Sequence, residues 1–464
     1  MLESLKHEGR RHDWIAEMSL RFDNQPWQIR MPGSASFVML SDPASIESVM
    51  VSQPDVFVKA EAHRALLREI LGDGIVNSAG ERWYHQRKTA AKFFSARTLR
   101  LCMVKTMQRN IAQVHEVLDA ECGTGRFANL STLFHQFTLQ TFLEIGVGID
   151  APIIGKSEPS AFNAIDEATA LIMRRRLVPS WLWKLQRWLN VGNEKKVKDV
   201  MSGVHAYVAN LIEQSLAKTN GEASGYSQDE KILTAVELFV EHSSEGTTGL
   251  RPRDLVDFVC NFMIAARDTS AATTMWLFYA LGKHPEIEAK IREELAIKLP
   301  PLGVGPDGYI TADHVKQLVY LEAVIKETLR FHPVAPYISR VASQDAVVDG
   351  DILIKKGQFV GMSSYAMARN PRVWGPDAAE FKPERWINAT TGELLSFPAS
   401  KFFTFGAGPR TCLGIKLAML NLRVMTANLL HRYKFEIDPA NDGSHVSAMV
   451  LAMKHTLMAK VERA

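Results

Sequence analysis

Helical periodicity of apolar positions accounts for most of the chain. The clearest case runs from near Pro252 to about Leu281, where Pro252 and Asp254 suit the first turn of a helix and the centre is apolar nearly all round. Such a helix is expected to be buried and to cross a whole domain. The same period predicts further helices over 83–94, 130–145, 195–216, 286–295, 318–331 and 413–433.

Short alternating segments predict a small amount of β-structure. A hairpin is expected over 27–40, and a second over 347–360 with turns at Gly350 and Gly357. Residues 382–400 are rich in Pro and Gly and predict a long ordered loop. The fold class is therefore mainly α with a minor β portion.

Composition sets limits on domain count and partners. The 464 residues are 46% hydrophobic and show no internal repeat or linker, so one domain over 1–464 is expected. Lys and Arg (54) barely exceed Asp and Glu (51), which argues against nucleic-acid binding. No apolar run reaches the ~18 residues of a membrane-spanning helix, and the N-terminus lacks the pattern of a signal peptide. We expect a monomer.

The four cysteines form no Cys-x-x-Cys pair and indicate free thiols. Cys102, Cys122 and Cys260 are interpreted as small buried apolar side chains. Cys412 differs, because three glycines and a proline within residues 405–414 impose an unusual backbone path around it. It precedes an apolar helix, whose N-terminal amides favour a thiolate. Arg410 can pair with an anionic group.

Phe405, Gly408, Arg410, Cys412 and Gly414 fill every fixed position of Phe-x-x-Gly-x-Arg-x-Cys-x-Gly. The segment therefore resembles the haem-binding signature of the cytochrome P-450 superfamily. The resemblance extends from about residue 12 to the end. It implies haem b between the long central helix and the cysteine loop, with Cys412 as the axial iron ligand.

Glu327 and Arg330 lie three residues apart on one predicted apolar helix. Such a pair alone is weak evidence. The resemblance identifies it with the family's Glu-x-x-Arg helix and 383–386 with its partner loop. It implies that Glu327, Arg330 and Arg385 form a buried ionic network that supports the haem loop.

Asp268 and Thr269 interrupt the apolar centre of the long helix. A threonine that bonds to its own helix is one interpretation. The resemblance implies instead the oxygen-activation site, where the Thr hydroxyl assists and the acid feeds protons through water. Ala266 stands where the family usually has glycine, and it could narrow the oxygen-side groove.

Trp83 and Arg87 lie four apart, which fits either an exposed aromatic–cation pair or the family's Trp-x-x-x-Arg, where both bind haem propionate. Arg340 resembles a further propionate partner. On the same helix, Lys88 and Lys92, followed by Arg97, fit either a solvated face or the docking site of an NADPH-dependent P-450 reductase.

Residues 71–88, 161–168 and 179–184 carry a resemblance that is less specific than the haem motif. It is closest to the eukaryotic long-chain fatty-acid ω-hydroxylases. The resemblance thus implies a monooxygenase that uses O2 to hydroxylate a fatty acid near its ω end. The Trp-rich 179–184, with Arg174, Arg175, Arg176 and Lys184 nearby, suits either contact with a membrane surface or an ordinary helix connection.

Full-length microsomal relatives carry an N-terminal anchor, and this chain begins after it would lie. Localisation is expected at the cytosolic face of the endoplasmic reticulum if an anchor exists in the full-length protein, and soluble or peripheral as given. Alternatives are another lipophilic substrate (a sterol, terpenoid or xenobiotic), a peroxide isomerase or dehydratase, and a non-catalytic haem-binding protein. The Asp268–Thr269 pair argues against the isomerase.

Overall fold

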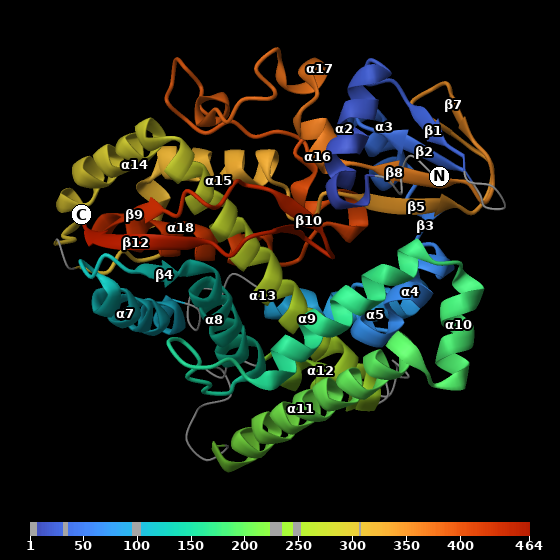
Figure 1. Cartoon of the computed structure of the whole chain (residues 1–464), viewed down its shortest axis with the longest axis horizontal. Coiled ribbons are helices and arrows are strands. Elements are labelled where there is room, and N and C mark those ends of the chain that lie inside the picture. Colours follow the sequence, from blue (N-terminus) through green and yellow to red (C-terminus); the bar gives the residue numbers. More distant parts are fainter. Residues whose placement is uncertain (1–6, 31–35, 95–103, 223–233, 245–251, 306–307) are drawn as a thin grey trace. The chain divides into compact units, whose positions relative to one another are not determined.

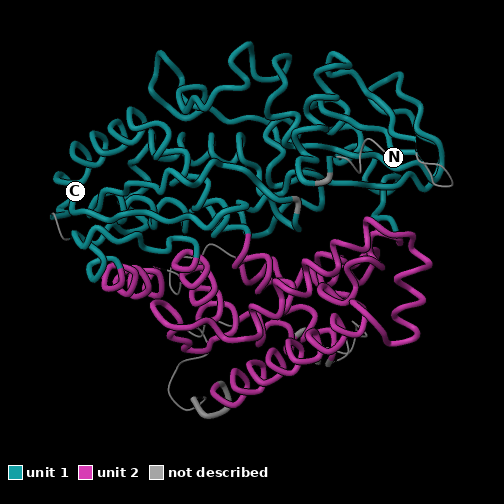
Figure 2. The backbone as a smooth tube through the Cα atoms, in the orientation of Figure 1, with its two compact units in different colours: residues 1–60, 118–131, 269–464 teal, residues 61–117, 132–268 magenta. Residues whose placement is uncertain are grey.

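The computed structural model describes residues 7–30, 36–94, 104–222, 234–244, 252–305 and 308–464. The backbone forms two compact units, which Figure 2 colours separately. Unit 1 comprises residues 1–60, 118–131 and 269–464, and unit 2 comprises residues 61–117 and 132–268. The prediction of a mainly α fold with a minor β portion is confirmed.

Helices dominate both units, and Figure 1 labels most of them. Unit 2 holds the middle helices, together with the first half of the longest one, α13. The helices are α2 (Arg11–Arg21), α3 (Pro43–Glu47), α4 (Glu61–Leu71), α5 (Gly80–Phe93), α7 (Val104–Glu121), α8 (Leu130–Phe142), α9 (Ser160–Met173), α10 (Ser180–Leu189), α11 (Gly192–Glu222), α12 (Ala235–Ser244), α13 (Pro252–Lys283), α14 (Pro285–Lys298), α15 (Val319–Phe331), α16 (Ser364–Ala368), α17 (Pro371–Trp374) and α18 (Ile415–Arg432).

The described strands belong to unit 1 and form four small sheets. A mixed sheet has the order β1-β2-β8-β5-β3, in which only β2 and β8 are parallel, and a second has the antiparallel order β4-β12-β9. Two hairpins, β6–β7 and β10–β11, complete the set. The strands are β1 (Trp27–Ile29), β2 (Phe37–Leu40), β3 (Phe57–Val58), β4 (Phe127–Asn129), β5 (Ile338–Ala342), β6 (Ala346–Val348), β7 (Ile352–Ile354), β8 (Phe359–Met362), β9 (Tyr433–Ile437), β10 (His445–Ser447), β11 (Leu451–Met453) and β12 (Met458–Arg463).

Polar side chains fix the ends of helices that carry the site. The Glu294 carboxylate on α14 accepts the amides of Tyr320 and Leu321 at 2.7 and 2.9 Å, in the first turn of α15. These amides have no partner within their own helix, and a carboxylate at this position also interacts favourably with the positive end of the helix dipole. The helix that contains Glu327 and Arg330 is therefore held at its start by a neighbouring helix.

The predicted helices are present with shifted ends, but the second predicted hairpin is only half right. Strands β6 and β7 pair around Gly350 as expected. After Gly357, β8 leaves this hairpin and joins the mixed sheet between β5 and β2. A run of alternating residues does not show which strand is its partner. The sequence pattern therefore assigned β8 to the β6–β7 hairpin, although it belongs to another sheet. The first hairpin, β1–β2, is confirmed, and its turn lies outside the described residues.

Candidate functional site

The Cys412 loop lies in unit 1 between two short 3-10 turns and helix α18. The turns are Phe403–Phe405 and Gly408–Arg410, and Gly414 is the residue before the first turn of α18. The Cys412 amide donates to the Phe405 carbonyl at 3.0 Å, which closes the loop on itself. Cys412 is exposed. The loop thus presents a thiol from a closed backbone frame just ahead of a helix N-terminus.

Glycine is required in this loop for two separate reasons. Gly406 and Gly408 have φ values of +73° and +67°, which L side chains rarely adopt. In addition, a Cβ at Gly408 would lie 1.9 Å from the carbonyl oxygen of Met50. The glycines read from the sequence therefore permit both the turn and its close approach to the segment around Met50.

Arg340 supplies the strongest local evidence for an anionic cofactor. It lies on β5 with 8% of its surface exposed, and Nη1 donates to the Ser339 carbonyl at 2.8 Å. Within the described residues, no carboxylate lies within ion-pair distance of it. Burial lowers the pKa of the Arg340 guanidinium to about 10. A buried cation without a carboxylate partner fits the propionate of a haem, which is the role that the resemblance implies for Arg340.

The predicted ionic network is confirmed in unit 1. Glu327 is fully buried, and its oxygens lie 2.7 Å from Arg330 Nε and 3.0 Å from Arg385 Nε. The same carboxylate also accepts the Trp386 indole N–H at 3.0 Å and the Lys382 amide at 2.7 Å. Because every oxygen is paired, this charge can stay buried. Arg330 in addition donates to backbone carbonyls that precede and follow α17, so the network ties α15 to the long loop.

Asp268 carries a partner that sequence reasoning missed. Arg267, the preceding residue on α13, lies with Nη1 2.7 Å from Asp268 Oδ1. Its guanidinium also pairs with Asp166 and Glu158, each at 3.1 Å. Burial raises the pKa of Asp268 to about 6, although Arg267 favours its charged form. One buried arginine is thus shared by three carboxylates, and the adjacent Arg–Asp pair was the only signal in the sequence.

Two threonines one turn after this point, Thr273 and Thr274, bond to carbonyls of their own helix. Thr273 Oγ1 donates to the Thr269 carbonyl at 2.8 Å, and Thr274 Oγ1 to the Ser270 carbonyl at 2.9 Å. Thr269 itself is partly buried beside Asp268. Back-bonds of this kind slightly destabilise a helix and often bend it.

Trp83 and Arg87 are brought together on α5 in unit 2. The Arg87 guanidinium lies 5.7 Å from the centroid of the Trp83 ring, and both side chains are partly buried. This geometry matches the spacing that the sequence singled out. The two residues can offer an indole N–H and a guanidinium to one anionic group from a single helix face.

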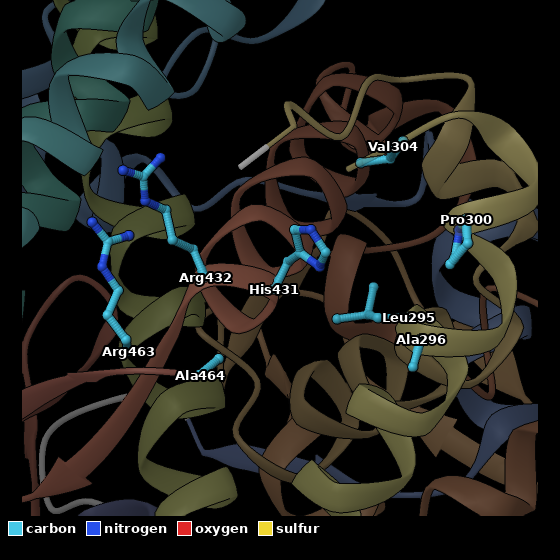
Figure 3. A pocket seen from close by; sticks show the side chains of 8 residues that line it. All are labelled: Leu295, Ala296, Pro300, Val304, His431, Arg432, Arg463 and Ala464. Carbon is cyan, nitrogen blue, oxygen red and sulfur yellow. The ribbon is translucent and has the colours of Figure 1, made fainter. Parts of the chain in front are cut away.

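Figure 3 shows a cavity of about 310 Å³ in unit 1, between α14, the end of α18 and the end of β12. Arg432 and Arg463 point the same way in this view, and both pair with Asp119, at 2.7 and 3.0 Å. None of the residues that the sequence singled out for haem or oxygen chemistry lines the cavity. Both arginines already share the Asp119 carboxylate, and the cavity lacks the candidate residues, so it is not the candidate site.

Comparison with known proteins agrees with this chemistry. The sequence profile of the family described as Cytochrome P-450 matches residues 5–461. Cytochrome P-450 86B1 of Arabidopsis thaliana is 30% identical over 99% of this chain and 83% of its own length. Cytochrome P-450 monooxygenase cyp1 of Mycosarcoma maydis is 30% identical over 93% and 69%. Noroxomaritidine synthase of Narcissus is 27% identical over 94% and 84%. The Cys412 loop, the buried Arg340 and a match over nearly the whole length together establish that this chain belongs to the cytochrome P-450 family, as a haem-thiolate monooxygenase with haem b as its cofactor.

Proposed function

We propose that this monooxygenase hydroxylates a long-chain fatty acid near its ω end, with electrons delivered by an NADPH-dependent reductase. The proposal is supported by the likeness of residues 71–88, 161–168 and 179–184 to fatty-acid ω-hydroxylases. Haem b held by a thiolate activates O2 for insertion of one oxygen atom into an unactivated C–H bond. One relative is named noroxomaritidine synthase, so membership of the family does not by itself fix the substrate.

The side chains proposed to hold the haem are those that the resemblance to the family implies. In unit 1, Cys412 is the ligand to iron, with Phe405, Gly408 and Gly414 shaping its loop, and Arg340 and Arg410 neutralise propionates. In unit 2, Trp83 and Arg87 bind propionate from α5. A buried cation such as Arg340 gains most from this pairing, because it has already lost its hydration.

Asp268 and Thr269 are the proposed groups for proton delivery. With a pKa of about 6, the Asp268 carboxyl exchanges protons readily near neutral pH. Arg267 holds the carboxylate form, so Asp268 can lose its proton without leaving a lone buried charge. The Thr269 hydroxyl, on the next residue of α13, is the proposed recipient of protons that Asp268 supplies through water. This acid–alcohol pair is the observation that favours an oxygen-activating enzyme over a peroxide isomerase.

Reductase contact is assigned to the exposed lysines of α5. Lys88 and Lys92 are one helical turn apart and both exposed, so they form one basic face. Arg97, the third residue predicted for this face, lies outside the described residues. Two cations at this spacing suit an acidic partner surface and would act mainly on the rate of association.

A membrane surface, such as the cytosolic face of the endoplasmic reticulum, is the further proposed partner. Among the described residues, no helix is long and apolar enough to cross a bilayer. Helix α10 nevertheless exposes Trp181 and Trp188 by 64% and 80%. Further exposed apolar residues surround them on and beside α10: Leu177, Val178, Leu185, Leu189 and Val191.

Helix α10 carries exposed basic side chains beside its exposed apolar ones. Lys184 and Arg187 are exposed on the same helix, while Trp183 is buried on its inner side. Beneath it, the buried Arg175 pairs with Glu69 at 2.7 Å and Glu194 at 2.6 Å. Exposed tryptophans beside basic side chains suit the headgroup region of an anionic bilayer. Contact through α10 would place the enzyme at the surface into which an acyl-chain substrate partitions.

The substrate proposal is tested by optical titration of the ferric holoprotein with fatty acids of increasing chain length. A saturable shift of the haem from low to high spin, followed by an ω-hydroxylated product that requires NADPH and reductase, is the expected result. A thiolate-haem spectrum without any shift across the series would remove fatty acids as the substrate class. Sterols, terpenoids and xenobiotics would then be the next candidates in the same titration.

A further inference from the structure

The segment between α4 and α5 in unit 2 is fastened to α13 by two glycine sockets. A Cβ at Gly72 would lie 2.1 Å from the carboxyl carbon of Asp257, and a Cβ at Gly74 would lie 2.1 Å from Nδ2 of Asn261. Asp257 and Asn261 are four residues apart, so they project from one face of α13. Each polar side chain therefore occupies the space that any residue other than glycine would fill.

Hydrogen bonds complete this attachment. Asp257 Oδ2 accepts the Asp73 amide at 2.8 Å. Asn261 Oδ1 accepts the Val76 amide at 3.0 Å, and its Nδ2 donates to the Leu71 carbonyl at 2.7 Å. Both side chains are buried, with 5% and 1% of the residue surface exposed. A short loop whose backbone groups are satisfied by a neighbouring helix is fixed rather than free to open.

The same loop is joined to α5 from its other side. The Asp73 carbonyl accepts from Gln86 Nε2 at 2.9 Å, and the Asp73 carboxylate pairs with Arg82 at 2.7 Å. Gln86 is fully buried. Arg82 and Gln86 flank Trp83 and Arg87, which stand on the same two turns of α5. A single residue, Asp73, thus links α13 to the helix that carries the proposed propionate ligands.

We propose that Asp257 and Asn261 are positioning residues, which hold α5 at the haem by fixing residues 72–77 against α13. The inference rests on the proposed role of Trp83 and Arg87 in binding propionate. Neither Asp257 nor Asn261 is expected to touch the cofactor. Their effect is to limit the movement of α5, so their loss frees the helix without removing a ligand.

The test uses the haem-loaded protein and two readouts, the rate of haem transfer to excess apomyoglobin and the resonance Raman band of the haem propionate bend. Asn261→Ala is expected to accelerate haem transfer about tenfold, as loss of a buried hydrogen-bonding group at this anchor would, and to move the propionate band in the same direction as Arg87→Gln. Amide exchange at Asp73 and Val76 should rise in parallel. Asp257→Asn keeps an acceptor for the Asp73 amide and should behave like the unchanged protein.

A matched control separates positioning from general loss of stability. Thr138 is buried in unit 2 and donates to the Arg267 carbonyl at 3.0 Å, away from the loop. Thr138→Val should leave both haem readouts unchanged. Gly74→Ala should mimic Asn261→Ala, yet add nothing in the Asn261→Ala background, because the socket is then empty.

The outcomes distinguish the two proposals. If Arg87→Gln loosens haem and Asn261→Ala does not, α5 binds propionate but the positioning role is wrong. If Arg87→Gln also has no effect, the assignment of α5 to the propionates is wrong, and the positioning role fails with it. Equal effects of Thr138→Val and Asn261→Ala, or failure of Asp257→Asn to keep the normal rate, would also overturn the inference.

Discussion

Arg267 Nη1 lies 2.7 Å from Asp268 Oδ1, so the acid proposed to deliver protons is paired with the residue just before it on α13. The same guanidinium also contacts Asp166 and Glu158. Asp268 therefore shares its counter-ion with two competing carboxylates, and burial raises its pKa to about 6. With this pKa, the Asp268 carboxyl can both hold and release a proton near neutral pH.

Asp268→Asn is expected to lower product formation at least tenfold while the thiolate-haem spectrum is retained, because general acid–base groups contribute about 10²–10⁴ to rate. NADPH use should fall less than product, which is measured as the ratio of the two. Equal product per NADPH in both proteins would contradict a proton-delivery role. Infrared difference spectra between the same two proteins give the pH dependence of this carboxyl.

The carboxylic-acid band of Asp268 should be present below pH 6 and disappear as the pH rises through it. Since this pKa lies above the ordinary value of 3.8, the folded state binds an extra proton between about pH 4 and 6, and the group's contribution to stability falls as pH rises through that window. Arg267→Gln should move the midpoint upward, because it removes the partner of the charged form.

Arg340→Met tests the proposed pairing of Arg340 with a haem propionate, in the apoprotein and in the haem-loaded protein. A buried guanidinium whose pKa falls from 12.5 to about 10 destabilises the apoprotein, so the substitution should raise its free energy of unfolding by about 3 kcal/mol. Haem should be released faster from the same variant, because a propionate loses its cation. Urea unfolding of the apoprotein and haem transfer measure the two effects. If the variant apoprotein is more stable and also releases haem more slowly, the propionate role is contradicted.

Reversal of charge at the basic face of α5 should act on electron delivery alone. Lys88→Glu with Lys92→Glu is expected to slow reductase-supported turnover about tenfold at low ionic strength and less at high salt. Turnover supported by a chemical peroxide should stay unchanged. Lys298→Glu with Lys356→Glu, at two exposed lysines outside α5, makes the same change in net charge and is the matched control. An effect that is equal at both sites would show only a dependence on net charge.

How much of this the sequence could predict depended on whether the evidence was local. Five residues at fixed spacing around Cys412 identified the haem loop, and the resemblance to the family singled out Trp83 and Arg87, which lie one helical turn apart. Arg267 could not be assigned, because its partners Asp166 and Glu158 lie 101 and 109 residues earlier in the chain. The sockets at Gly72 and Gly74 were equally hidden, since a glycine reveals nothing about which distant side chain fills its place.

The exposed tryptophans of α10 predict binding to anionic lipid vesicles. Trp181→Ser with Trp188→Ser should weaken partitioning at least tenfold, because two amphipathic rings no longer enter the interface. Ile297→Ser, at an apolar residue of α14 that is 60% exposed, is the control for general loss of exposed apolar surface and should have little effect. Vesicle sedimentation measures the partitioning. Binding to neutral and anionic vesicles with equal strength would contradict a role for Lys184 and Arg187.

Gly408→Ala provides the most direct test of the cysteine loop. The added methyl group would lie 1.9 Å from the Met50 carbonyl oxygen, and φ at this position is +67°. We expect the loop to be displaced and the carbon-monoxide difference spectrum of thiolate-bound haem to be lost or shifted to that of a neutral ligand. Gly350→Ala is the matched control, because Gly350 has a φ of +83° and a Cβ added there would meet no atom within 4 Å, so this variant carries the backbone cost without the clash. If both variants keep the thiolate spectrum, close packing at Gly408 does not hold Cys412 in place. If both lose it, strain in a remote hairpin is enough to disturb the haem, and the spectrum no longer reports on the loop.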